Sequence, residues 1–99
     1  MNDYQSLISE SKVVLVEFYA SWCPHCRRMM PIVDDIKELL GSRVPVYQFY
    51  IDENSELADR VGADTVPTFI IYRDGEEAWR YSGEIDGNAL YSKIEGFMK

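Results

Sequence analysis

The sequence predicts an α/β fold with a mixed sheet of about four strands flanked by four helices. Four segments carry apolar residues at helical spacing, and four others are rich in β-branched and aromatic residues. The two kinds of segment alternate until a final hairpin, which predicts a parallel β-α-β unit followed by an antiparallel pair in one sheet. Because the chain has 99 residues, 46% of them hydrophobic, we expect a single domain spanning residues 1–99.

The first elements are a short helix and a buried strand. Apolar residues at helical spacing, after capping candidates at the chain start, predict a helix that ends before Ser11. Residues 13–19 are almost continuously apolar, which is typical of a central strand covered on both faces. Glu17 is the one interruption, so this carboxylate needs a separate explanation.

A long amphipathic helix is predicted next. Its apolar stripe runs from Pro24 and includes Leu39, and Gly41 stops the pattern. We expect a kink at Pro31, which cannot donate a helical hydrogen bond. An edge strand is predicted over residues 44–51, because alternating apolar residues follow a proline near its start.

The second half adds a helix, a hairpin and a last helix. Asn54 can cap a helix that Gly62 ends. Asp74-Gly75 predicts a tight turn between strands 68–72 and 78–82. The last amphipathic helix is expected after Asp86 and Asn88, with its apolar stripe made by four residues, Leu90, Ile94, Phe97 and Met98.

Charge and hydropathy exclude several classes of function. The net charge is -7 and there is no block of lysines or arginines, so neither nucleic acid nor an anionic membrane is an expected partner. The longest apolar run has four residues, Val13–Val16, and no basic segment followed by an apolar stretch opens the chain. We therefore expect no membrane partner and a cytoplasmic location, where a lone cysteine pair points to redox work.

The cysteine pair Cys23 and Cys26 is the candidate catalytic centre. Cys23 lies where a strand has ended and a helix begins, with Pro24 at the first helical position. Free amides and the helix dipole favour a thiolate there, lowering a cysteine pKa from about 8.5 to roughly 3.5–7.5. A protonated His25 would act in the same direction. Because Cys26 follows one helical turn later, we expect a redox-active Cys23–Cys26 disulfide in which Cys23 attacks and Cys26 resolves.

Other uses of the cysteines are less well supported. Two buried structural cysteines are possible, but the strand-to-helix junction should leave Cys23 exposed. A zinc site would crowd Cys23, His25 and Cys26 into four residues with no second ligand cluster, so no metal is expected, although a metal or cluster bridging two chains stays open. Haem attachment needs histidine after the second cysteine, where Arg27 stands.

With these motifs in register, almost the whole chain resembles the thioredoxin family. The motifs are the central strand 14–20, the active site Trp22-Cys23-Pro24-His25-Cys26, Pro31, Val66-Pro67-Thr68, Asp74-Gly75-Glu76 and Gly83. The resemblance implies a thioredoxin-like fold lacking the first strand and a protein disulfide oxidoreductase that needs no bound cofactor. It also implies protein thiols and disulfides as substrates, and a thioredoxin-reductase-type or other thiol electron donor.

The resemblance assigns a substrate-binding loop and its flanks. It implies a cis bond before Pro67, and backbone groups of Thr65, Val66 and Pro67 that pair with an extended client peptide near the cysteines. Trp22 and Gly83 would flank the substrate groove. Ordinary packing is the alternative for Trp22, because an amphipathic ring suits a core as well as a binding surface.

Glu17 matches the family's buried acidic position beneath the resolving cysteine. Desolvation should raise its pKa, so that it can act as general base for the Cys26 proton. Gln48 stands where many thioredoxins carry a lysine that pairs with this acid, which should raise the pKa further. The alternative is a carboxylate at the strand end that reaches water.

Two departures from the family pattern bear on activity and stability. Pro24-His25 stands where thioredoxin has Gly-Pro and resembles the pair used by oxidising periplasmic enzymes. The reduction potential of such enzymes reaches about -120 mV, compared with about -270 mV for thioredoxin. We therefore expect a more oxidising, isomerase- or oxidase-like poise, unless His25 is a tolerated surface residue with a screened charge. The absent first strand should make residues 44–51 an exposed edge, with lower stability or dimerisation as a result.

Three rival functions stay open: a general thioredoxin-type reductase, a glutaredoxin-like glutathione-dependent enzyme and a peptide-binding adaptor. The glutaredoxin hypothesis rests on two similarities. The cysteine-proline motif resembles that family's active site, and Thr65-Val66-Pro67 resembles its glutathione loop. The presence of Trp22, Glu17 and Pro31 favours thioredoxin. In an adaptor the cysteines would be incidental.

Overall fold

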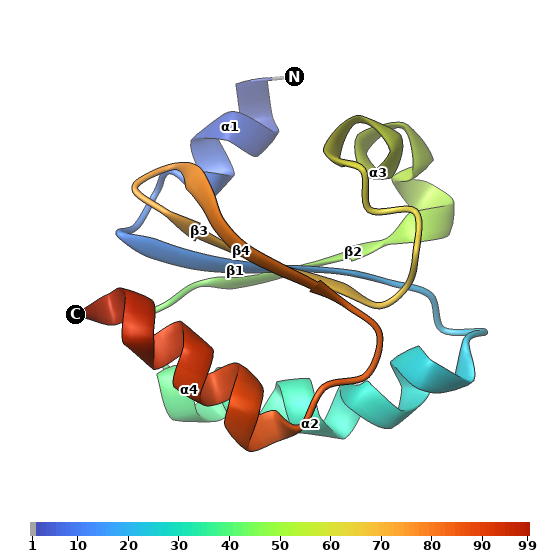
Figure 1. Ribbon diagram of the computed structural model, residues 1–99. Helices are drawn as coiled ribbons and strands as arrows, with labels where there is room; N and C mark the ends of the chain where they lie inside the picture. The colour runs from blue at the N-terminus through green and yellow to red at the C-terminus, as the bar shows by residue number, and fades with distance from the viewer. Residues whose placement is uncertain (1) are drawn as a thin grey trace.

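The computed structural model describes residues 2–99 and arranges them as a four-stranded sheet between two layers of helices (Figure 1). The predicted α/β class is confirmed. The elements in chain order are α1 (Asn2–Ile8), β1 (Val13–Tyr19), α2 (Pro24–Leu40), β2 (Val46–Tyr50), the 3₁₀ helix η1 (Ile51–Glu53), α3 (Ser55–Val61), β3 (Thr68–Arg73), β4 (Glu76–Ser82) and α4 (Gly87–Met98).

The strand order is β2-β1-β3-β4, so β1 is central and β2 is an edge. β1 runs parallel to β2 and antiparallel to β3. Its central position explains its near-continuous apolar character, because every residue except Tyr19 is buried. In this register Glu17 lies opposite Gln48 on one side and Phe69 on the other.

The predicted edge strand is shorter than residues 44–51. Pro45 still accepts a hydrogen bond from the Leu15 N–H through its carbonyl at 3.0 Å, but it has no N–H to donate, and β2 begins at Val46. After Tyr50 the chain tightens into η1 instead of continuing as strand. The turn directs the chain away from the sheet towards α3.

Each face of the sheet carries its own core. Figure 1 shows α2 and α4 on one face and α1 and α3 on the other. The first core gathers buried residues of α2, α4 and the sheet, and the second gathers those of α1, α3 and the opposite sheet face. Leu39 was expected on the apolar stripe of α2 but is 60% exposed, because the stripe centres on Ile36 and Leu40 at the helical period.

The turn and cap predictions had mixed outcomes. Asp74 and Gly75 both adopt positive φ, 55° and 81°, as the predicted hairpin turn requires, and β4 begins directly after it. Asp86 caps α4 by accepting the Ala89 N–H at 3.2 Å. Asn54 precedes α3 but makes no side-chain cap; its amide instead donates to the Tyr50 carbonyl at 2.9 Å.

The long helix α2 runs unbroken through Pro31, and the expected kink there stays a prediction. Within residues 2–99, none of the helices combines the length and apolar character that crossing a membrane requires.

Candidate active site

The polypeptide places Cys23 at the N-terminus of α2, directly after the turn that follows β1. Cys23 has an extended backbone (φ -91°, ψ 123°) and makes no side-chain cap, while Pro24 occupies the first turn. Free helical amides are therefore available to the sulfur. The pKa of Cys23 is lowered, chiefly by the backbone N–H of Cys26 and further by the N–H of His25 and the charge of Arg27.

The two thiols differ in accessibility and in acidity. Cys23 is 8% exposed and Cys26 is fully buried, and both are free thiols. Burial raises the pKa of Cys26 to about 11, and the nearby Cys23 and Glu17 add to the effect. The Cys26 sulfur accepts the Ala20 N–H at 3.4 Å. Cys23 is therefore the more acidic of the two thiols, and Cys26 stays protonated near neutral pH.

The expectation that Cys23 is exposed needs correction. Its side chain packs in a small cluster whose partly buried members include Val66, so only a small part of the residue reaches solvent. Cys23 is nevertheless the more accessible of the two thiols, because it retains some exposure and Cys26 has none.

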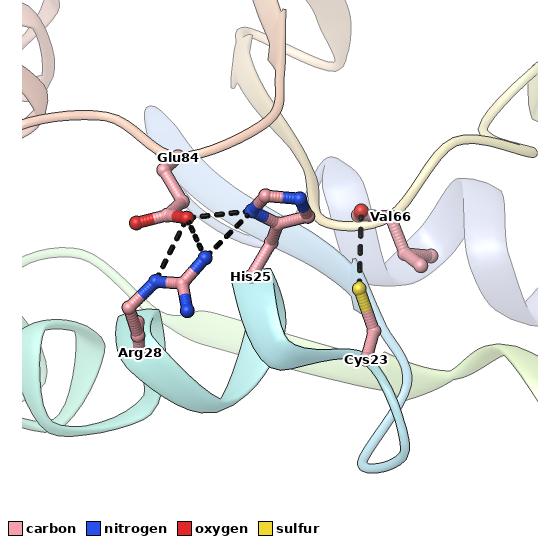
Figure 2. Close-up of polar contacts among 5 residues, drawn as sticks. All are labelled: Cys23, His25, Arg28, Val66 and Glu84. Atoms are coloured by element: carbon pink, nitrogen blue, oxygen red, sulfur yellow. Dashed lines mark hydrogen bonds and ion pairs between the residues drawn. The ribbon is translucent and has the colours of Figure 1, made fainter.

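The loop before β3 lies against the cysteine. The Val66–Pro67 bond is cis, and the Cys23 thiol points to the Val66 carbonyl at 3.9 Å (Figure 2). The Pro67 carbonyl accepts the Gly83 N–H at 2.8 Å, so the two predicted sides of the site are joined through the backbone. Thr65 is exposed, and its carbonyl accepts the Thr68 hydroxyl.

Trp22 is a surface residue of the site. Its side chain is 59% exposed, which contradicts the alternative of ordinary packing. The indole N–H donates to Asp52 Oδ2 at 3.0 Å, and the Tyr50 hydroxyl donates to the same oxygen at 3.0 Å. The carboxylate of Asp52 thus fixes one edge of the ring while the rest stays open to a partner.

Glu17 is 1% exposed, so the alternative of a carboxylate reaching water is wrong. Burial is the main cause that raises its pKa to about 7. Gln48 Nε2 donates to Glu17 Oε1 at 2.9 Å, and Lys37 Nζ donates to Gln48 Oε1 at 3.2 Å. The expectation that Gln48 raises the Glu17 pKa further needs correction. Gln48 hydrogen-bonds both the Glu17 carboxylate and the Lys37 ammonium of α2, and both Gln48 and Lys37 lower the pKa of Glu17 against the effect of burial.

His25 does not point its Nδ1 towards the cysteine. Figure 2 shows that nitrogen facing Glu84, at 2.6 Å from Oε2. Arg28 binds the same oxygen through Nε at 2.9 Å and Nη2 at 2.5 Å. Arg28 and then His25 lower the Glu84 pKa to about 2. The sequence analysis did not identify Glu84 or Arg28 as residues of the site. The one signal in the sequence was that Glu84 is an acidic residue directly after Gly83.

No group of three or more histidine, cysteine or acidic side chains in the described part of the chain could hold a metal ion. A cavity of about 540 Å³ lies between α1 and α3, and its lining includes Tyr4, Phe49 and Arg60 but neither cysteine. The cysteine pair therefore lies outside that cavity.

Comparison with known proteins places this arrangement in a family. The family model described as Thioredoxin matches residues 1–96. The chain is 36% identical over 90 residues to a thioredoxin of Rickettsia bellii, covering 91% of this chain and 86% of that protein. It is 33% identical over 99 residues to the chloroplastic Thioredoxin Y of Oryza sativa, covering 99% of this chain and 59% of that one. The chain belongs to the thioredoxin family.

Solved structures agree on the fold. A mutant thioredoxin from Halobacterium salinarum superimposes with a TM-score of 0.89 at 32% identity, covering all of this chain and 86% of that one. Fasciola hepatica thioredoxin gives 0.86 at 30% identity, with 97% and 92% covered. The chloroplastic relatives are longer, and the chain spans 51–59% of the length of four of them, including the one from Oryza sativa.

Proposed function

We propose that this protein catalyses thiol-disulfide exchange with protein substrates through Cys23 and Cys26. The observation that carries the proposal is the contrast between the two thiols. Cys23 retains some exposure and has a lowered pKa, whereas Cys26 is fully buried and has a raised one. An attacking thiol must be ionised and accessible, while a resolving thiol can stay protonated until it is needed.

The exchange proceeds in two steps. The Cys23 thiolate attacks a substrate disulfide, forms a mixed disulfide and expels one substrate thiolate. Cys26 then loses its proton to Glu17 and attacks Cys23 Sγ, which forms the Cys23–Cys26 disulfide and expels the second substrate thiolate. Two electrons pass from the dithiol to the substrate, and a thiol donor restores the dithiol. Run in reverse, the same steps oxidise a substrate dithiol.

The substrate segment docks on the loop beside Cys23. Backbone groups of Thr65, Val66 and Pro67 suit an extended peptide, and the contact between Cys23 and the Val66 carbonyl brings the loop to the reacting sulfur. Trp22 and Gly83 flank the segment. The exposed indole supports this role for Trp22, because its open face offers apolar contact area.

We propose that the reduction potential of the Cys23–Cys26 pair is higher, and so more oxidising, than that of a thioredoxin with Gly-Pro between its cysteines. Such a potential would suit isomerase-like activity. Amides at the helix start and the Arg27 charge stabilise the Cys23 thiolate, and a stabilised thiolate favours the reduced form. His25 supplies a further positive charge when protonated. We expect a potential between about -270 and about -120 mV.

The deciding experiment is the redox equilibrium of the purified protein with glutathione, followed by trapping of the free thiols. A potential above that of a Gly-Pro variant, made by Pro24→Gly with His25→Pro, supports the oxidising poise. An equal or lower value contradicts it and identifies a general reductase. Turnover of glutathione mixed disulfides without activity on protein disulfides would identify a glutaredoxin-like enzyme instead.

An adaptor function is tested separately. Cys23→Ser should abolish exchange with a protein disulfide, whereas an adaptor would still bind its client.

For the electron donor we propose a thioredoxin-reductase-type enzyme. Coupling NADPH oxidation to the reduction of an insulin disulfide tests this proposal. A cytoplasmic location stays a proposal, which imaging of the tagged natural protein tests.

A further inference from the structure

Two side chains near Cys23, those of His25 and Arg28, converge on one carboxylate oxygen of Glu84. His25 and Arg28 come from the first turns of α2, and Glu84 comes from the loop between β4 and α4. Glu84 Oε2 lies 2.6 Å from His25 Nδ1, 2.9 Å from Arg28 Nε and 2.5 Å from Arg28 Nη2. Figure 2 shows this clamp beside the cysteine.

The clamp fixes how His25 is held. A carboxylate only accepts hydrogen bonds, so Nδ1 must carry a proton to sit 2.6 Å from Glu84 Oε2. Arg28 Nη2 also lies 3.0 Å from Nδ1, but a guanidinium only donates and cannot bond a nitrogen that carries a proton. The carboxylate is therefore the partner that anchors the ring.

The clamp also decides the charge beside the sulfur. Without Glu84, Arg28 and a protonated His25 would leave two unopposed positive charges on the first turns of α2, the helix that begins directly after Cys23, and the charge of Cys23 already acts on Arg28. Glu84 places a negative charge against both of them, which weakens their combined field at the sulfur. Arg27 is outside the clamp, because its guanidinium donates to the Ser21 carbonyl at 3.2 Å.

Building on the proposed function, we propose that Glu84 is a positioning residue that lowers the reduction potential of the Cys23–Cys26 pair by holding His25 and Arg28 in this clamp. Positive charge near Cys23 stabilises its thiolate and so stabilises the reduced dithiol, which makes the disulfide a stronger oxidant. Glu84 opposes that effect and keeps the reduction potential of the Pro-His motif below that of a dedicated oxidase.

The test is Glu84→Gln, measured as the equilibrium constant with glutathione in low and high salt. We expect the variant to shift about threefold to tenfold towards the dithiol, where tenfold corresponds to about 30 mV. Because His25 is 59% and Glu84 37% exposed at the side chain, the shift should shrink in high salt. Glu77→Gln is the matched control: it also removes a carboxylate paired with an arginine, at 2.8 Å on β4, and should leave the equilibrium within about twofold.

Two further variants make the outcome decisive. Glu84→Asp keeps the negative charge and should stay nearer to the wild type than Glu84→Gln does. In a background of His25→Ala with Arg28→Ala, Glu84→Gln should cause less than half of its shift in the wild type. An unchanged equilibrium in Glu84→Gln, or a full shift in that background, would overturn the proposal. A wild-type protein that fails to exchange with a protein disulfide would instead overturn the proposed function.

Discussion

A buried carboxylate next to a buried thiol is the residue-scale feature that most constrains the chemistry. Glu17 lies in the central strand with almost no exposure, and such a site normally disfavours its charged form. Gln48 donates directly to Glu17 and accepts from Lys37. The pKa of about 7 follows from these opposing effects, so the group can both take and return a proton near neutral pH.

The raised pKa makes stability depend on pH. Glu17 titrates near 4.5 when unfolded and near 7 when folded, so the folded protein binds more protons between those values. The free energy of unfolding therefore falls as pH rises through that window, by about 3 kcal/mol from this residue. In the Glu17→Gln variant, the free energy of unfolding should no longer fall with pH by this amount, because glutamine does not titrate. Urea unfolding at pH 4.5, 6 and 8 measures it, and parallel curves for both proteins would contradict the burial argument.

The same residue should control the resolving step. Without a base at position 17, Cys26, with its pKa of about 11, must lose its proton to water, and release of a mixed disulfide should slow about tenfold or more. The pH profile of release should lose its inflection near 7 in Glu17→Gln. The attack of Cys23 on a small disulfide serves as the internal control, because its rate should change little.

The residues within the motifs could be predicted from sequence, but their partners could not. The spacing of the two cysteines identified Cys23 and Cys26, and the single charged residue in an apolar strand identified Glu17. Lys37 and Glu84 act only because α2 packs beside β2 and beside the loop that precedes α4. Neither contact has a local signature, since the residues involved are 11 and 56 positions apart.

At the scale of elements, short-range chemistry predicted the hairpin and one cap well. It failed at Asn54, where a 3₁₀ turn before α3 directs the amide to the Tyr50 carbonyl. The last helix was expected to start after both Asp86 and Asn88; Asp86 caps it, but Asn88 lies inside α4, which begins at Gly87. Cap propensity thus names a candidate, and the preceding turn decides whether the side chain reaches the helix.

The Asp86 cap should contribute measurable stability. Asp86→Ala leaves the Ala89 N–H without its 3.2 Å partner and should lower the free energy of unfolding by about 1 kcal/mol. Asn88→Ala is the matched control, because Asn88 lies inside α4 and alanine is a better helix former there. Equal losses in the two variants would show that the cap is not the cause.

The hairpin turn should not tolerate a side chain at Gly75. This residue has φ +81°, and an added Cβ would lie 2.7 Å from Ser9 Oγ. Gly75→Ala should therefore cost more than the roughly 1 kcal/mol of a positive φ alone. Adding Ser9→Gly removes the contact and should restore only part of the loss, which thermal unfolding of the three variants can resolve. Full recovery would mean that backbone strain is negligible at this turn.

At the scale of the whole molecule, one sheet joins two cores. Adjacent residues of β3 divide between them, with Ile71 in the core of α2 and α4 and Ile70 in the core of α1 and α3. Loss of packing on one face of β3 would also disturb the other face, because the backbone of β3 pairs with both β1 and β4. The two cores should therefore unfold together, as a single domain requires.

Matched substitutions test this cooperativity. Ile70→Val and Ile71→Val each remove one methylene from a fully buried side chain, and each should cost about 1 kcal/mol. Far-UV circular dichroism follows all helices, while tryptophan fluorescence includes Trp79, which packs against the first core. In both variants the two signals should follow one urea transition. If Ile70→Val moved the dichroism curve and left the fluorescence curve in place, the two faces would be independent units, because only separate units could unfold one core without the other.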